Sequence, residues 1–463
     1  MQSYNNMKNK YLRQDVKDCY KPSDYIKYLL VTMAFSCAII VGLYYQQAMY
    51  FSALLWALFL FFIPTEYSIM ALLYLMSFEY VFRFTTTSGS IFTFLQIIPV
   101  IKIVFFDKVF SIDKKCLFSY MLLLVYICTV SFTEIQSFLR IAFGLIILVC
   151  VFQNETGKRI NCKHLIVFYS VGIIMSALFA ATNSRAAAPY ISNLVVRLSD
   201  GSALYRFTGL YSNPNYFSIE VSLALAGNLV LFMSKEEKWY ELVLIGGLLF
   251  WLGIVSQSKT FTISLAFMLV YTIIYYGRHK PTYLLGLMLL ILSAAFFFKT
   301  EVRSFFEKYL YRFISLNENN SSIDDITTGR IEIWKMYIDA FISDFRVLFL
   351  GNGIGSKVLN YDAHNMYIES IYCLGIIGSA IYGVAIWGTQ NNTIKRRNYL
   401  LFLSVLLIRG LAANIAFYIN VYYYFLILFV MMGSNASNIE IHESTTDQEP
   451  LLRNNPNRLS YIK

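Results

Sequence analysis

One histidine stands out among the residues that could carry out acid–base chemistry. The chain has four histidines, and His364 lies directly before an apolar run long enough to form a membrane helix. The other three fall in segments that the pattern of positive charge, described below, assigns to the opposite side of a membrane. Imidazole accepts and releases protons near neutral pH, so His364 is the candidate general base. Alternatively, His364 only sits at the membrane interface and caps the following helix together with Asn365.

Three cations are expected on the same side as His364. Arg206 shortly precedes residues 213–215 (Asn-Pro-Asn), whose order is typical of the N-cap and first residue of a helix. Arg330 and Lys259 lie in two further connections on that side. A helix start with free backbone N–H groups beside a guanidinium favours an anion, and pairs of arginines bind diphosphates without a metal. The sequence therefore predicts an anion site.

Two carboxylates, Glu220 and Glu369, are expected inside apolar spans, where ionisable residues are rare and usually functional. Glu369 is four residues after Asn365, so both should share a helix face. Small residues repeat every four positions from Gly375 to Gly383, which predicts the close approach of another helix. The adjacent pair at 324–325 (Asp-Asp) is only weak evidence for a metal site, and we expect neither a metal nor another cofactor.

The elements that must position these residues are membrane helices. The 463 residues are 57% hydrophobic and 14% charged, whereas soluble proteins carry roughly 25% charged residues. We expect an all-α, polytopic bundle of about fourteen spans. The expected spans are 27–45, 47–63, 67–83, 91–106, 116–133, 135–152, 164–181, 216–233, 239–256, 260–277, 282–298, 366–388, 398–415 and 417–433.

The distribution of basic residues predicts the orientation. With the N-terminus in the cytoplasm, short basic connections such as 107–115, 153–163 and 389–397 all fall on the cytoplasmic side. The same bias accounts for most of the net charge of +10, and no basic soluble domain that would bind nucleic acid is visible. The predicted organisation is a cytoplasmic segment at 1–26, a transmembrane domain at 27–433 with long extracytoplasmic loops at 182–215 and 299–365, and a disordered cytoplasmic tail at 434–463.

The second long loop contains an amphipathic pattern. Apolar residues recur at spacings of three and four between Ile331 and Phe345. We therefore expect a helix near 329–345 that lies on the membrane surface or on the bundle.

The order of these parts resembles the O-antigen polymerase (Wzy) and O-antigen ligase family of lipid-linked glycan transferases. The similarity covers approximately the second half of the chain. The segments that carry it are Arg206 to Asn215, Ser258-Lys259-Thr260, Gly329-Arg330 with Trp334, Gly351 to Gly355, and His364-Asn365 followed by Glu369, Gly375 and Gly378. Lys259 departs from the family, which more often has arginine there.

The resemblance implies a GT-C-like membrane enzyme on the periplasmic or outer face of the bacterial plasma (inner) membrane. It would move a glycan from undecaprenyl diphosphate to the hydroxyl of another lipid-linked repeat unit, without a metal and with inversion. Arg206 and Arg330 would hold the diphosphate and His364 would activate the acceptor. Further substrate-binding residues would be Lys259, Asn215, Asn365, Glu369 and Glu220.

Other functions remain open at this stage. A ligase would transfer the glycan to lipid A–core instead, and a flippase or other transporter would move the same lipid-linked glycans. A transporter should line its midplane with charges, whereas the candidate residues here gather at one face. Arg140 and Arg409 are the exceptions, and they could bind lipid phosphate or pair with Glu side chains in the bundle. The family resemblance also suggests a chain-length regulator and a flippase as partners, alongside membrane lipid.

Overall fold

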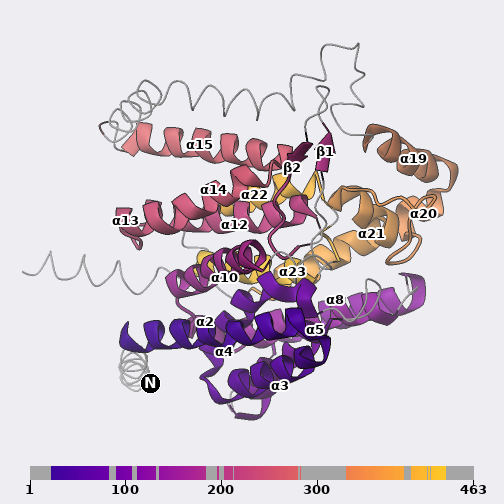
Figure 1. The fold of residues 1–463 in the computed structure, drawn as a ribbon. Coiled ribbons are helices and arrows are strands. Elements are labelled where there is room, and N and C mark those ends of the chain that lie inside the picture. Colours follow the sequence, from indigo (N-terminus) through magenta and orange to yellow (C-terminus); the bar gives the residue numbers. More distant parts are fainter. Residues whose placement is uncertain are drawn as a thin grey trace, which may run out of the picture.

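The computed structural model shows a helical bundle (Figure 1). It describes residues 22–82, 90–106, 112–131, 135–183, 195–197, 203–211, 213–279, 282, 330–390, 398–413, 415–417 and 419–433. The amphipathic stretch predicted near 329–345 is confirmed as a helix, α19, at Arg330–Ser343. The adjacent aspartates at 324–325, most of the predicted span 282–298 and the predicted tail lie outside the described residues.

The elements of the first half are all helical. They are α2 (Pro22–Tyr44), α3 (Gln46–Phe62), α4 (Thr65–Leu75), the 3-10 helix η1 (Met76–Phe82), α5 (Ile91–Leu95), α6 (Ile97–Ile101), the π-helix η2 (Lys102–Phe106), α7 (Lys114–Tyr126), the π-helix η3 (Ile127–Ser131), α8 (Ile135–Phe152), α9 (Glu155–Arg159) and α10 (Cys162–Thr182).

The second half adds one small antiparallel sheet to the described helices. Its elements are β1 (Val195–Arg197), β2 (Ala203–Tyr205), α12 (Pro214–Met233), α13 (Trp239–Glu241), the π-helix η4 (Leu242–Gly246), α14 (Gly247–Val255), α15 (Lys259–His279), α19, α20 (Phe345–Leu350), α21 (Met366–Gly388), α22 (Tyr399–Gly410) and α23 (Ile419–Gly433).

Among the described residues, five helices are long and apolar enough to cross a membrane: Asp24–Tyr44, Cys162–Thr182, Pro214–Met233, Lys259–Arg278 and Met366–Gly388. Shorter apolar helices accompany them, and large apolar side chains such as Phe62, Phe105 and Leu244 are 67–79% exposed. A surface of this kind suits lipid rather than water. The structure thus supports an all-α membrane protein, while the count of about fourteen spans stays a prediction.

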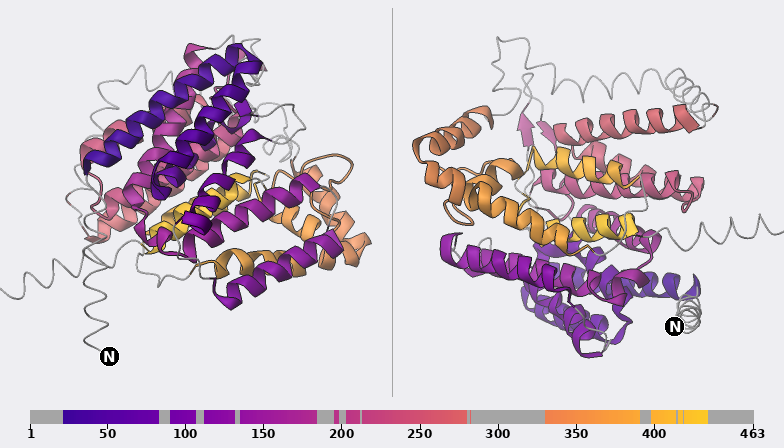
Figure 2. Two further views of the ribbon diagram at one scale, coloured as in Figure 1. Left: turned by 90° about the horizontal axis from the view of Figure 1, so that it is seen from below. Right: turned by 180° about the vertical axis from the view of Figure 1, so that it is seen from behind.

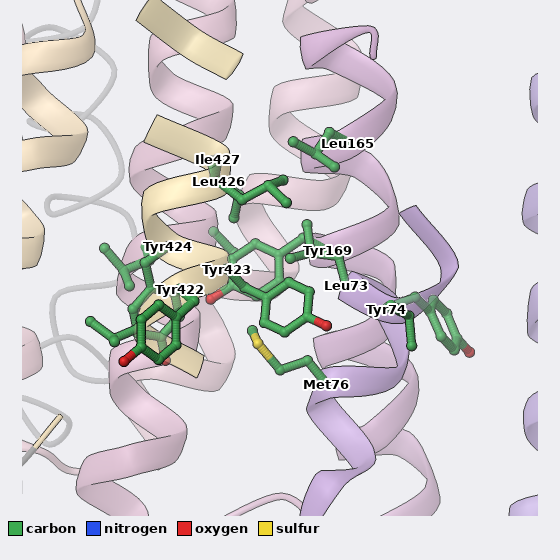
Figure 3. Close-up of a cluster of buried hydrophobic side chains, with 14 of the residues drawn as sticks. Leu73, Tyr74, Met76, Leu165, Tyr169, Tyr422, Tyr423, Tyr424, Leu426 and Ile427 are labelled. Carbon is green, nitrogen blue, oxygen red and sulfur yellow. The ribbon is translucent and has the colours of Figure 1, made fainter. Parts of the chain in front are cut away.

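Helix α12 is the centre of the bundle. In its most apolar stretch 83% of the residues are buried, and it packs against α10, α14, α15 and α22. Figure 3 shows the neighbouring core, to which α10 contributes Tyr169 and α23 contributes Tyr422, Tyr423 and Tyr424. Because α12 is held from several sides, the residues at its N-terminal end occupy fixed positions.

The two ends of the bundle differ. Figure 1 places β1, β2, α19 and α20 at one end, on the right of the view, and α13 with the start of α2 at the other. The view from behind in Figure 2 keeps the same separation. The described elements within both predicted extracytoplasmic loops are therefore at one end of the molecule.

Helix α21 is broken at Gly375, which has a φ of 70°. A Cβ there would lie 2.3 Å from the backbone oxygen of Phe349, so only glycine fits against the end of α20. The backbone groups released by the break find partners, because the nitrogens of Asn352 and Gly353 donate to the oxygens of Tyr372 and Cys373 at 2.7 and 3.0 Å.

The predicted stripe of small residues from Gly375 to Gly383 is confirmed only at its first residue, because Gly375 lies against α20 and Gly383 contacts no other described element. Four-residue spacing defines one face only in a continuous helix, and the break at Gly375 interrupts it. A Cβ on Gly383 would meet nothing within 4 Å, whereas one on Gly378 would be 2.3 Å from the ring of Tyr126. The close approach to α7 therefore occurs at Gly378.

Candidate functional site

Asn215 makes the central hydrogen bonds at the N-terminal end of α12. The cap prediction is confirmed, since Asn213 is the N-cap, with its side-chain oxygen accepting from the backbone nitrogen of Asn215 at 2.8 Å, and Pro214 follows at N1. The side-chain oxygen of Asn215 itself accepts from Arg206 Nη2 at 3.1 Å and from Ser258 Oγ at 3.2 Å. One amide thus joins two of the segments that the sequence analysis selected.

Arg206 is fixed against the connection between α14 and α15. Its Nε donates to the backbone oxygen of Ser256 at 3.3 Å, and the nitrogen of Phe207 donates to the oxygen of Val255 at 3.1 Å. Arg206 is only 7% exposed. Lys259, the first residue of α15, is half-buried beside Ser258. The structure therefore brings the predicted residues Arg206, Asn215 and Lys259 into one region.

Arg409, near the end of α22, also belongs to this region. Its Nη2 donates to the backbone oxygen of Asn215 at 2.9 Å and to Ser218 Oγ at 2.5 Å. The side chain is 1% exposed, and Nε and Nη1 are buried without a hydrogen-bond partner. None of the ion pairs among the described residues includes Arg409. The only sequence signal for it was the rarity of arginine inside a span.

Arg330 and His364 lie close together, between α19 and the start of α21. Trp334 and Tyr337 of α19 hold the loop before α21, because they donate to the backbone oxygens of Ala363 at 2.9 Å and Tyr361 at 2.7 Å. Arg330 is one turn before Trp334 and so lies on the same face of α19. This anchoring brings the guanidinium of Arg330 close to His364.

The electrostatics of this pair favour a neutral imidazole. Burial lowers the pKa of His364, and the positive charge of Arg330 lowers it further. Burial also lowers the pKa of Arg330, an effect that the nearby Tyr216 of α12 opposes. Arg330 is close enough to Arg409 for the two charges to repel. Tyr216 directly follows Asn215, so the arginines converge on the start of α12.

Asn365 acts as the predicted cap. Its side-chain oxygen accepts from the backbone nitrogens of Tyr367 and Ile368 at 2.9 and 3.2 Å. His364, immediately before it, has a φ of 48°, a conformation that is uncommon outside glycine, although asparagine, aspartate and histidine adopt it more often than other residues. The cap and the unusual backbone together fix the position of the imidazole.

The two predicted carboxylates have different surroundings. Glu369, in the first turn of α21, has a buried Oε2 without a hydrogen-bond partner. Glu220 is 1% exposed, and its carboxylate accepts from Tyr169 at 2.5 Å, Tyr424 at 2.5 Å and Asn420 at 2.9 Å. These contacts join α10, α12 and α23, and a substrate-binding role for either carboxylate stays a prediction.

The arrangement is suited to a polyanion. Arg206, Arg330 and Arg409 lie around the start of α12, and neither Arg330 nor Arg409 belongs to an ion pair among the described residues. A buried charge without a partner is unfavourable, so an incoming anion would relieve that cost. In the described part of the chain no group of three or more His, Cys, Asp or Glu residues could hold a metal ion.

Comparison with protein-family models, curated proteins and solved structures found no match to this chain.

Proposed function

We propose that this chain is a membrane glycosyltransferase of the O-antigen polymerase type. It would transfer a growing glycan from undecaprenyl diphosphate to a hydroxyl of another lipid-linked repeat unit. The observation that carries the proposal concerns Arg409. Its Nη2 donates to the backbone oxygen of Asn215, while its Nε and Nη1 are buried without an acceptor. Buried donors normally have partners, and three neighbouring guanidiniums match a ligand with several phosphate charges.

The cations would act on the leaving group. As the bond from the anomeric carbon to the diphosphate oxygen breaks, the electron pair stays with the diphosphate and negative charge develops there. Arg206 and Arg330, with Lys259 as a third cation, would stabilise that charge in a poorly solvated site. Asn215 would keep Arg206 oriented, since it accepts from Nη2. In this proposal the arginines neutralise the leaving group and no metal takes part.

His364 would act on the acceptor. A neutral imidazole nitrogen takes the proton of the acceptor hydroxyl while the hydroxyl oxygen bonds to the anomeric carbon, and a single displacement inverts that centre. Arg330 supports this role, because its charge lowers the pKa of His364 and keeps the imidazole unprotonated. Asn365, Glu369 and Glu220 would contribute to acceptor binding or to holding α21 and α12 in place.

The proposal places the reaction at the outer face of the bacterial inner membrane, in a GT-C-like bundle of about fourteen spans. The product would be O-antigen, capsule or exopolysaccharide, made together with a flippase and a chain-length regulator. The grouping of cations at one end of the bundle, rather than along its midplane, is what supports a transferase over a transporter.

Complementation tests this function. A producing strain that lacks the gene is supplied with His364→Ala, Arg206→Ala or Arg330→Ala, and its glycans are separated by size. We expect long chains to disappear in all three variants and to persist with Lys335→Ala, an exposed cation on α19. Long chains that survive all three substitutions would contradict the proposal.

The same strain separates polymerase from ligase. Loss of a polymerase leaves core carrying a single repeat unit, because ligation still occurs. Loss of a ligase leaves bare core and an accumulation of lipid-linked polymer. We expect the first pattern.

A further inference from the structure

The glycine-rich run Gly351–Gly355 directly follows α20 and has no part in the proposed transfer reaction. No charged residue lies between Arg346 and Lys357 in the sequence. An uncharged, largely apolar stretch of this length is too short to cross a bilayer. It suits either a buried core or a segment that enters the membrane and returns to the same side. The exposure of its side chains distinguishes the two.

The exposed side chains of α20 are apolar, which excludes a purely buried segment. Phe345 and Phe349, four residues apart on one face, are 66% and 47% exposed, whereas Val347 on the other face is buried. The apolar surface continues onto α21, because Gly375 lies against Phe349 and Ile377 is 44% exposed. Since α21 is long and apolar enough to span a membrane, α20 extends a surface that suits lipid.

Two neighbouring helices indicate the depth of the end of α20. The predicted topology places the start of α7 at Lys114 and the end of α21 at Gly388 on the cytoplasmic side. At 1.5 Å per residue, Tyr126 is about 18 Å from the start of α7, and Gly375 is about 20 Å from the end of α21. Both residues contact the end of α20. In a hydrocarbon layer about 30 Å thick, this point lies roughly 10 Å below the outer boundary.

The backbone of the turn after α20 is hydrogen-bonded to other parts of the protein. The nitrogens of residues 352–353 donate to carbonyl oxygens of α21. The hydroxyl of Tyr126 is 2.8 Å from the backbone oxygens of both Leu350 and Leu374 and shares its proton between them. A Cβ on Gly351 would be 2.5 Å from a backbone oxygen of α21, so glycine permits this approach. Irregular backbone is tolerated at membrane depth only when protein or water satisfies it.

We propose that α20 and the turn Gly351–Gly355 form a re-entrant segment that dips into the outer leaflet of the membrane. Phe345 and Phe349 contact the acyl chains of the phospholipids there. The side chain of Arg346, in the first turn of α20, reaches back to the level of the headgroups, and the chain returns to water at Lys357. This placement depends on hydropathy and topology and is independent of the proposed glycan transfer.

Electron paramagnetic resonance of the full chain in phospholipid liposomes tests the proposal. Serine replaces Cys19, Cys37 and Cys128, because the four other cysteines are buried and should not be labelled. The chain without an added cysteine is the blank. A nitroxide is attached to Phe349→Cys, and its collisions with oxygen, which concentrates in lipid, are compared with its collisions with a water-soluble nickel chelate.

We expect the ratio of oxygen to nickel collisions at Phe349→Cys to equal that at the lipid control Ile377→Cys. It should be several-fold higher than at Lys335→Cys, an exposed position on the charged face of α19. The depth at Phe349→Cys should be greater than that at Phe345→Cys by roughly the rise of one helical turn, about 5 Å. This difference distinguishes a segment that dips into the membrane from one that lies flat on it.

Three outcomes would overturn the proposal. A ratio at Phe349→Cys equal to that at Lys335→Cys would place the segment in water. Equal depths at Phe345→Cys and Phe349→Cys would mean that α20 lies flat on the surface. An immobile nitroxide that neither reagent reaches would show that protein covers this face, either another part of the chain or a second copy.

Discussion

The side chain of Arg409 donates to the backbone oxygen of Asn215 at 2.9 Å, across 194 positions of sequence. The side-chain oxygen of the same Asn215 accepts from Arg206 at 3.1 Å. One residue at the start of α12 therefore sets the positions of two guanidiniums from distant parts of the chain. Substitutions at this junction should change anion binding more than they change folding.

The substitution Asn215→Asp should keep a side-chain oxygen that accepts from Arg206, but that oxygen would belong to a negatively charged carboxylate. The resulting ion pair cancels part of the positive charge offered to a diphosphate. We expect KM for the lipid-linked donor to rise about tenfold, equivalent to about 1.4 kcal/mol, with a smaller change in kcat. The neighbouring cap variant Asn213→Asp keeps a capping oxygen and is the control. An unchanged KM in Asn215→Asp would rule out this role.

Arg409→Met separates function from stability. Replacing a buried charge that lacks a counter-ion with an apolar side chain is often neutral or stabilising. We therefore expect the melting temperature in detergent to be unchanged or higher, together with a loss of glycan transfer. If Arg409 only held α22 to α12, the variant would instead melt earlier and, where folded, stay active.

The pH dependence of transfer should follow His364. The base works when neutral, so kcat/KM should fall at acidic pH with a midpoint below the ordinary imidazole value of about 6.5. Asp362 raises the pKa of His364 and Lys357 lowers it. Asp362→Asn should therefore move the acidic limb to lower pH, and Lys357→Met should move it to higher pH.

These two residues form a good pair for comparison. They pair with each other at 2.8 Å and are 42–45% exposed, so either substitution should have little effect on stability. Profiles of kcat/KM measured between roughly pH 4.5 and 8 would reveal the shifts. If the acidic limb of the kcat/KM profile does not move in either variant, or moves in the same direction in both, His364 is not the base.

The titration of Glu237 should make the stability of the fold depend on pH. It lies between α12 and α13, is 4% exposed, and neither carboxylate oxygen has a hydrogen-bond partner. Burial, with a contribution from Glu241, raises its pKa to about 7. The folded state thus holds a proton that the unfolded chain releases near pH 4.5, so stability falls as pH rises from about 4.5 to about 7.

Glu237→Gln should remove this dependence and stabilise the chain at pH 8. A shift of this size corresponds to on the order of 3 kcal/mol. Thermal melts at pH 5.5 and 8 in detergent measure it, with Glu236→Gln as the control for loss of a neighbouring charge. A variant that is no more stable than the wild type at pH 8 would contradict the assignment.

Gly375→Ala and Gly383→Ala form a further matched pair. The first places a Cβ against the backbone of Phe349 at a φ of 70°, whereas the second meets open space. We expect Gly375→Ala to lose about 2 kcal/mol or more of stability and Gly383→Ala to melt like the wild type. Equal melting temperatures would mean that the break in α21 tolerates a side chain.

Local signals in the sequence predicted local structure well. The Asn213 cap, the Asn365 cap and the amphipathic helix α19 each depend on residues close together in the chain. Arg409 could not be assigned in this way, since its partners come from the packing of α22 against α12. The break at Gly375 likewise depends on the approach of α20. The contacts that residues make between distant helices were therefore what the sequence could not predict.

The central claim is tested most directly by reconstitution. The purified chain is placed in liposomes with undecaprenyl-diphosphate-linked repeat units and a metal chelator, and the lengths of the glycans are followed over time. We expect a ladder of longer glycans from the wild type, no ladder from His364→Ala or Arg330→Met, and a normal ladder from Lys335→Ala. Glycans that never lengthen with the wild type, or that lengthen equally with all variants, would contradict the account.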